Sequence, residues 1–171
     1  KPIIINSSRG AVVSNEALKS ALRKGEVMGA IIDTWENEPN IDLQLLRLVD
    51  IATPHIAGYS ADGKWNATKM SLETINKFFK LNKDPIELLP IVEPDKTVIN
   101  LSQYSNEEQL AKALLYSYDP CEDSALLKES PNRFYYFRSH YPLRREYKAY
   151  TIENANKKTA ALAKELGFDI K

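Results

Sequence analysis

Short apolar runs alternate with amphipathic stretches along the first sixty residues. Residues 2–5 are apolar and largely β-branched, and the runs at 28–33 (MGAIID) and 49–54 (VDIATP) have the same character, which is typical of buried strands. Apolar residues recur at helical spacing between 15 and 24, and a leucine-rich stretch at 43–48 indicates a second, shorter helix. This order of strand, helix, strand, helix and strand predicts a parallel sheet with covering helices.

Polar residues and glycine mark the ends of the first predicted helix. Ser14 is expected to cap its N-terminus, with Glu16 in the first turn. Gly25 is expected to end the helix in a left-handed conformation. The predicted cap residues therefore agree with the helix that the spacing of the apolar residues predicts.

The chain continues with a long helical pattern and then changes character. Residues 60–81 carry an apolar stripe at helical spacing, and residues 83–96 contain three prolines, which indicates a linker. A small α/β or α+β module is predicted beyond it. Its expected elements are a strand at 97–102, a helix at 105–118 that starts in a Ser105–Glu108 capping box, a helix at 123–130, a strand at 146–153 and a helix at 154–167.

Composition narrows the class of protein. Hydrophobic residues make up 43% of the 171 residues, which is enough for a packed core. Lys plus Arg and Asp plus Glu number 23 each, so no basic surface for nucleic acid or an anionic membrane is predicted. The single cysteine, Cys121, fits a reducing cytoplasm, and no apolar run approaches the roughly 20 residues of a membrane span. Lys1 leads directly into a strand, so the sequence is expected to be part of a larger protein.

Four polar residues follow the ends of the predicted parallel strands. Arg9 comes after the first strand, Asp33 ends the second, Glu38 lies in the following loop, and His55 comes after the third. Ligands of open parallel sheets bind at the edge formed by the carboxyl ends of the strands. An arginine fork binds a carboxylate, a histidine transfers a proton near neutral pH, and a glutamate beside it fixes its tautomer. The set would suit a 2-hydroxy acid that loses a hydride to a nicotinamide.

Each of these residues also has an ordinary structural interpretation. Arg9 could be a surface residue, His55 a satisfied polar group, Asp33 the cap of a turn and Glu38 a solvated side chain. Their common placement at one predicted sheet edge is what favours the functional interpretation.

Three blocks of the sequence resemble a known family. INSSRGAVVSNEALKSALRKG, AIIDTWENEP and DIATPHIAGYSADGK resemble the second half of the nucleotide-binding domain of D-2-hydroxyacid dehydrogenases, whose pattern runs N-x-x-R-G, D-V-x-x-x-E-P and T-P-H-x-A-G. Ser14 departs from that pattern, which usually has aspartate there, and this affects a helix cap. The resemblance implies an α/β fold with a partial Rossmann-type parallel sheet.

The resemblance also implies roles for named residues and a division of the chain. Arg9, Glu38 and His55 would be catalytic, with Arg9 binding the substrate carboxylate and Tyr59 also reaching the substrate. NAD would be the cofactor, without a metal. The residues implied to contact NAD are Ser7, Ser8, Arg9, Asp33 and Gly58. The implied parts are the C-terminal part of an NAD-binding domain (1–60), a helix returning toward a substrate domain (61–82), a linker (83–96) and a dimerisation domain (97–171).

A narrower resemblance concerns the second half of the chain. Tyr59, Trp35 and the stretches YPLRREY and LAKELGFDI resemble a member of this family that acts on a phosphorylated 2-hydroxy acid and forms a homodimer through an extra C-terminal domain. A phosphoglycerate- or glyoxylate-type dehydrogenase is the alternative, and a regulatory amino-acid-binding module is another possibility for the second half. The G-x-G-x-x-G loop and the acidic residue for the adenosine ribose do not occur in the sequence, so we expect this chain alone to be inactive.

An alternative of another class is that the chain acts mainly as an oligomerisation module. The stretch RFYYFRSHYPLRREY is rich in aromatic residues and arginine, which interface cores favour. The same aromatics could instead fill the core of a small module, and His140 is expected to be structural. The sequence leaves both interpretations open.

Overall fold

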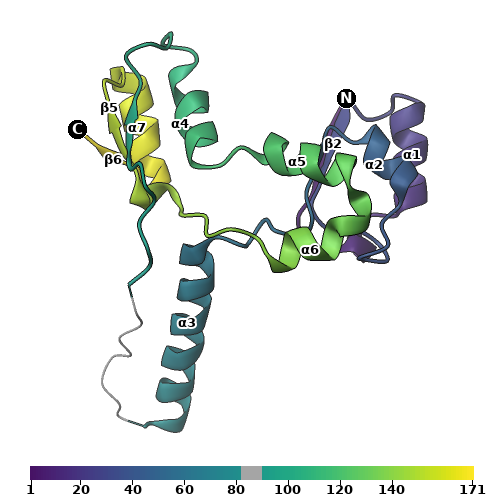
Figure 1. Cartoon of the computed structure of the whole chain (residues 1–171), viewed down its shortest axis with the longest axis horizontal. Coiled ribbons are helices and arrows are strands. Elements are labelled where there is room, and N and C mark those ends of the chain that lie inside the picture. Colours follow the sequence, from purple (N-terminus) through teal and green to yellow (C-terminus); the bar gives the residue numbers. More distant parts are fainter. Residues whose placement is uncertain (82–89) are drawn as a thin grey trace. The chain divides into compact units, whose positions relative to one another are not determined.

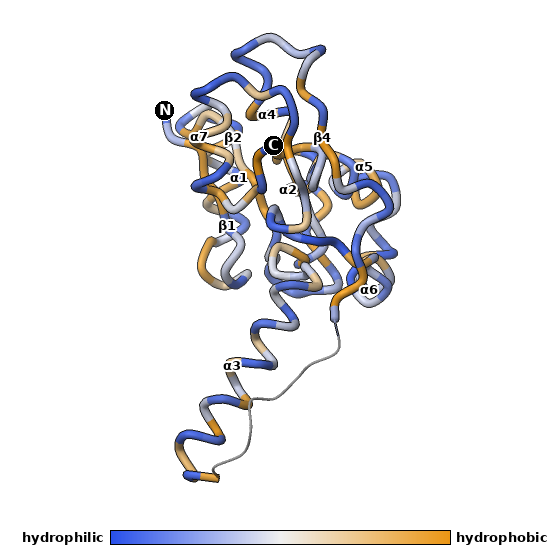
Figure 2. The backbone as a smooth tube through the Cα atoms, turned by 90° about the vertical axis from the view of Figure 1, so that its left-hand side faces the viewer, coloured by the Kyte–Doolittle hydropathy of each residue, from blue (hydrophilic) through white to orange (hydrophobic). Residues whose placement is uncertain are grey.

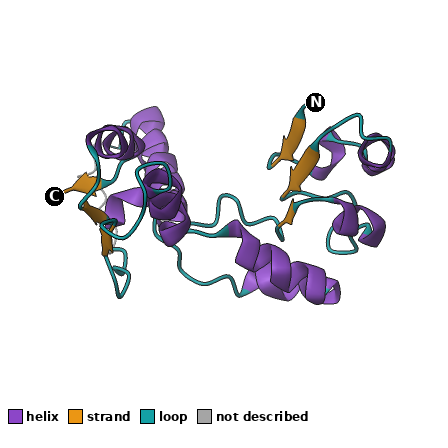
Figure 3. Ribbon diagram, turned by 90° about the horizontal axis from the view of Figure 1, so that it is seen from above, coloured by secondary structure: helices purple, strands orange, loops and turns teal. Residues whose placement is uncertain are grey.

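The computed structural model describes residues 1–81 and 90–171, which form two compact units (Figure 1). The first unit comprises residues Lys1–Ala57 and Asp119–Pro142, and the second comprises Gly58–Tyr118 and Leu143–Lys171. Each unit contains a three-stranded parallel sheet with helices, as Figure 3 shows with strands in orange. The predicted α/β class with a partial Rossmann-type sheet is thereby confirmed.

The sheet of the first unit has the order β1-β2-β3. Its strands are β1 (Ile3–Asn6), β2 (Gly29–Ile32) and β3 (Ile51–Ala52), and the helices between them are α1 (Asn15–Arg23) and α2 (Leu43–Leu48). Asn6 pairs with Ile32, and Ile32 pairs with Ala52, so the carboxyl ends of the three strands coincide. This is the alternation that the apolar pattern predicts.

The predicted ends of α1 are also present. The Ser14 hydroxyl accepts a hydrogen bond from the Ala17 amide at 3.4 Å, and Gly25 follows the helix with φ of 64°. Lys19 on the same helix is buried and donates to Asp42, the N-cap of α2, at 2.6 Å. The two helices are thus joined through one cap residue.

The expectation that residues 2–5 form a buried strand is wrong for one face of β1. Ile3 is 50% exposed and Ile5 is 66% exposed, whereas Asn6 is buried. Side chains of a strand alternate between the two faces of its sheet, so one face of β1 lies open among the described residues. An apolar run alone does not reveal which of its residues another element covers.

The helices α5 (Pro120–Glu129) and α6 (Phe134–Ser139) pack in the first unit, although residues 97–171 were predicted to form one separate domain. Figure 1 shows these green helices beside the first sheet. Leu127 is fully buried and Phe134 is 2% exposed in the same hydrophobic core as Leu18 and Leu45. Of the two interpretations of the aromatic stretch, Phe134 fits the core, while Tyr135 remains 69% exposed.

The second unit has a sheet of order β4-β5-β6. The elements around it are β4 (Val98–Asn100), α4 (Gln109–Ser117), η3 (Tyr147–Ala149), β5 (Thr151–Glu153), α7 (Lys157–Leu166) and β6 (Asp169–Ile170). Ile152 and Ala163 are fully buried in its core, and Gly167 ends α7 with φ of 103°. The helix predicted from 105 begins four residues later, because Ser105 and Glu108 bond to each other in a turn that precedes it.

The helix α3 (Ala61–Phe79) confirms the long helical pattern. Its apolar stripe is open along much of its length, with Met70 66%, Phe78 78% and Phe79 64% exposed. Figure 2 shows hydrophobic stretches in orange between hydrophilic ones in blue along α3. That α3 returns toward a substrate domain stays a prediction. Residues 83–89 of the predicted linker lie outside the described part of the chain. No helix in the described ranges combines the length and the apolarity needed to cross a bilayer.

A buried charge cluster joins the start of α3 to the segment after residue 142. Asp62 is fully buried, and Arg145 donates to its two carboxylate oxygens at 2.9 and 3.3 Å. The Glu146 amide and the Lys148 ammonium reach the same carboxylate at 2.8 and 3.2 Å. Burial alone would raise the pKa of Asp62, but hydrogen bonds from Arg145, the Glu146 amide and Lys148 outweigh it and lower that pKa.

Candidate active site

The carboxyl ends of β1, β2 and β3 form one edge, and the predicted polar residues follow it. Asn6, Ile32 and Ala52 are the register partners at the strand ends. Arg9 follows Asn6 by three residues, and Asp33 directly follows Ile32. His55 follows Ala52 by three residues. The sheet therefore brings three loops to one side of the first unit, as an active-site edge requires.

His55 and Glu38 form a hydrogen-bonded pair at this edge. The imidazole Nδ1 lies 2.8 Å from Glu38 Oε2, and the two side chains are 24% and 22% exposed. The other carboxylate oxygen, Oε1, accepts from the Trp35 amide at 2.8 Å, which holds the carboxylate in place. His55 has φ of 58°, a left-handed conformation, and its amide donates to the Asp33 carbonyl at 2.8 Å. Nδ1 is thereby engaged and the ring orientation is fixed by residues of two loops.

Asp33 organises the loop that carries His55. Its buried carboxylate accepts from Thr53 Oγ1 at 2.6 Å, from the Ile56 amide at 2.7 Å and from the Ala57 amide at 3.1 Å. These bonds tie the end of β2 to residues 53–57. The structure thus gives Asp33 an observed role in loop geometry, and its implied contact with a cofactor stays a prediction.

The loop after β1 carries Arg9 and is held by a buried asparagine. Asn6 Nδ2 donates to the carbonyls of Arg9 at 3.1 Å and Thr34 at 3.4 Å, and Asn6 Oδ1 accepts from the Ser8 amide at 3.2 Å. Arg9 is exposed, and its Nη1 donates to the Ser8 carbonyl at 2.7 Å. Ser7 and Ser8 are also exposed in this loop. The three residues are presented at the strand edge by backbone that Asn6 fixes.

Two residues that sequence reasoning did not assign support this arrangement. Gly10 begins η1 (Gly10–Val12), where a Cβ atom would overlap the Trp35 carbonyl, so only glycine fits. Trp35 is 3% exposed, and its indole Nε1 donates to the Thr53 carbonyl at 3.0 Å. Trp35 therefore links the three loops, and the tryptophan in TWENEP was the available signal.

The remaining predicted residues, Gly58 and Tyr59, begin the second unit. A Cβ on Gly58 would meet no atom within 4 Å, and the Tyr59 ring lies under the Lys64 ammonium at 4.2 Å from the ring centroid. Their implied contacts with cofactor and substrate stay predictions.

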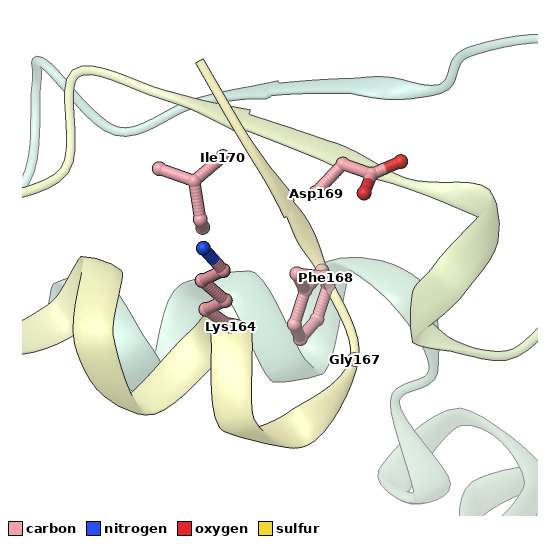
Figure 4. A pocket seen from close by; sticks show the side chains of 5 residues that line it. All are labelled: Lys164, Gly167, Phe168, Asp169 and Ile170. Carbon is pink, nitrogen blue, oxygen red and sulfur yellow. The ribbon is translucent and has the colours of Figure 1, made fainter.

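The second unit contains a pocket that does not involve the predicted residues. It lies where α7 meets β6, and Figure 4 shows its lining side chains. Lys164, Gly167, Phe168, Asp169 and Ile170 line it. None of these residues was predicted to be catalytic, so the candidate chemistry rests on the strand edge of the first unit.

Family models match two parts of the chain. Residues 1–57 match the family model described as the NAD-binding domain of D-isomer specific 2-hydroxyacid dehydrogenases, and residues 88–167 match a domain of unknown function, DUF3410. The chain is 50% identical over 150 residues to an erythronate-4-phosphate dehydrogenase of Bacteroides fragilis, covering 88% of this chain and 41% of that protein.

Similar enzymes occur in other bacteria. An erythronate-4-phosphate dehydrogenase of Porphyromonas gingivalis is 42% identical over 168 residues, covering 98% of this chain and 45% of that protein. One of Photorhabdus laumondii is 37% identical over 171 residues, covering 97% and 45%. The chain thus spans less than half the length of these relatives. Over most of its own length the chain is similar to erythronate-4-phosphate dehydrogenases, and its first 57 residues match the NAD-binding domain of D-isomer specific 2-hydroxyacid dehydrogenases.

Proposed function

We propose that the complete protein is an NAD-dependent dehydrogenase that oxidises 4-phospho-D-erythronate to its 2-oxo acid, a step of pyridoxal phosphate (vitamin B6) biosynthesis. The observation that carries the proposal is the pair of His55 Nδ1 and Glu38 Oε2, 2.8 Å apart at the carboxyl edge of the sheet. The name of the relatives supports the substrate. This chain by itself is proposed to be inactive, because the sequence lacks the loop that would hold the pyrophosphate.

The residues at the edge suit the chemistry of alcohol oxidation. Nδ1 of His55 is engaged by Glu38, which leaves Nε2 as the atom that takes the proton from the substrate hydroxyl. The Glu38 carboxylate stabilises the imidazolium that results. Arg9 pairs with the substrate carboxylate through its guanidinium and keeps the C2–H bond oriented. In the reverse direction, protonated His55 returns the proton to the ketone oxygen.

The strand edge also fits a nicotinamide cofactor. When bound, NAD supplies the acceptor for the hydride that leaves C2. The exposed backbone at Ser7 and Ser8 and the Asp33 carboxylate are proposed to contact its nicotinamide end. The contacts of Gly58 with NAD and of Tyr59 with the substrate are proposed from the family resemblance alone. Arg9 lies in the same loop as the two serines. The reaction is proposed to occur in the cytoplasm, where the free thiol of Cys121 would stay reduced.

Assays of the complete protein test the substrate. With NAD present, 4-phosphoerythronate is expected to be oxidised with kcat/KM at least about 100-fold above that for 3-phosphoglycerate. The shorter acid lacks the carbon that bears the 3-hydroxyl, and a site that hydrogen-bonds a substrate hydroxyl strongly rejects an analogue without it. Formation of NADH at 340 nm is the measurement. Preference for 3-phosphoglycerate, or for glycolate (the reduced form of glyoxylate), would instead assign the protein to one of those sister activities.

We also propose that the complete protein is a homodimer through its C-terminal domain. Support comes from apolar residues left open on α4 and α7, where Leu115, Tyr116, Leu162 and Leu166 are 38–46% exposed. Exposed apolar surface of this kind is common at subunit interfaces. Light scattering on the complete protein is expected to give twice the chain mass, and Leu166→Glu is expected to shift it toward one chain mass. A wild-type monomer at micromolar concentration would contradict the proposal.

A further inference from the structure

The segment formed by α5 and α6 contacts the backbone that leads to His55. We call residues 120–139 the backing segment. Lys128 Nζ donates to the carbonyls of Val49 at 2.7 Å and Asp50 at 3.0 Å, and Ser124 Oγ accepts from the Ala52 amide at 3.0 Å. Arg138 Nε donates to the His55 carbonyl at 3.2 Å. The backing segment thus hydrogen-bonds to the backbone from Val49, just before β3, to His55, the proposed proton carrier.

These contacts satisfy polar groups where the sheet ends. Within the described residues β3 pairs only with β2, so its other edge has no neighbouring strand. The Ala52 amide is buried there, and the Ser124 hydroxyl takes the place of a strand partner. A buried amide without an acceptor would destabilise the fold, so this bond fixes β3 against the helix.

The backing segment is itself firmly anchored. Leu127 and Phe134 are 0% and 2% exposed in the core of the first unit. Tyr141, just beyond α6, donates to the Asp123 carboxylate in α5 at 3.0 Å and so ties the two ends of the segment together. Arg138 therefore projects from a rigid support, although 83 residues separate it from His55.

We propose that Arg138 is a positioning residue for His55. His55 adopts φ of 58°, a conformation that a residue with a side chain rarely occupies without support from its surroundings. Arg138 donates to the carbonyl of His55, and Asp33 accepts from the Ile56 amide of the same peptide unit. Together these bonds keep the His55 imidazole at the Glu38 carboxylate. The role in turnover rests on the proposed function. It means that the second half of the chain contributes to the chemistry of the first.

Kinetics of the complete enzyme test this role. Arg138→Met is expected to lower kcat about 10- to 100-fold, because small displacements of a reacting group have effects of this size, and to leave KM for 4-phosphoerythronate within about twofold. Arg138→Lys keeps a donor and is expected to recover part of kcat. Arg133→Met is the matched control, since Arg133 lies beside α6 over the rings of Tyr136 and Phe137. It is expected to stay within about twofold of the wild type.

A spectroscopic measurement separates positioning from activity. NMR spectra of the complete enzyme with ¹⁵N-labelled histidine report on this pair. The resonance of the His55 Nδ1 proton, bonded to the Glu38 carboxylate, is expected downfield of the amide protons. Arg138→Met is expected to shift or broaden that signal, and Arg133→Met to preserve it. An unchanged signal and unchanged kcat in folded Arg138→Met would overturn the inference and leave the proposed function intact. If the wild type oxidises no 4-phosphoerythronate, the proposed function fails, and the resonance alone still tests the positioning.

Discussion

His55→Ala in the complete enzyme is expected to lower kcat by about 10²–10⁴-fold, which corresponds to roughly 3–5 kcal/mol of activation free energy. The reason is that His55 is the proposed proton carrier, held by Glu38 at 2.8 Å. Glu38→Gln keeps the shape of the side chain but removes its charge, so a smaller loss in kcat is expected. Steady-state NADH formation with 4-phosphoerythronate measures both effects.

The second histidine of the chain provides a matched control. His140 follows α6, stacks on Tyr136 with ring centroids 4.4 Å apart, and has no role in the proposed chemistry. His140→Ala is expected to retain kcat within about twofold. Turnover of His55→Ala near the wild-type value would show that another group carries the proton.

Asp62→Ala is expected to destabilise the protein by about 3–5 kcal/mol, because it leaves the Arg145 guanidinium buried without its main counter-charge. The free energy of unfolding, obtained from the urea-induced unfolding transition of the second unit, measures the effect. Glu73→Ala on the same helix removes an exposed pair with Lys69, 3.9 Å apart, and is expected to cost less than about 0.5 kcal/mol. Equal effects of the two substitutions would contradict the importance of the buried cluster.

The same cluster predicts a dependence of stability on pH. The pKa of Asp62 is lower in the folded protein than its ordinary value of about 3.9, so its contribution is fully present above that value. The contribution is lost as the pH falls through the lowered pKa. Asp62→Asn cannot titrate, and the free energy of unfolding of this variant is expected to change less steeply with pH below about 4.

Local rules account for the parts of the fold that the sequence predicts well. The apolar runs predict the strands of the first sheet, and Ser14 and Gly25 mark the ends of α1, since each of these signals depends on residues a few positions apart. The pairing of His55 with Glu38 was also predictable, because parallel strands bring their carboxyl ends to one edge. The two-residue strand β6 is too short to give a pattern.

Contacts distant in sequence account for what the sequence did not predict. Nothing near Arg138 or Ser124 indicates that they reach residues 55 and 52, because these contacts depend on how α5 and α6 pack. The family resemblance assigned Asp33 to the cofactor. The bonds it accepts from the Ile56 and Ala57 amides became apparent only with the folded loop.

The central claim is that His55, oriented by Glu38, exchanges the proton of the substrate hydroxyl. The most direct measurement is a crystal structure of the complete enzyme with NAD and 4-phosphoerythronate. His55 Nε2 is predicted to lie about 2.6–3.2 Å from the C2 hydroxyl oxygen, with Nδ1 still on the Glu38 carboxylate. An imidazole turned away from that hydroxyl, with another side chain in its place, would contradict the account.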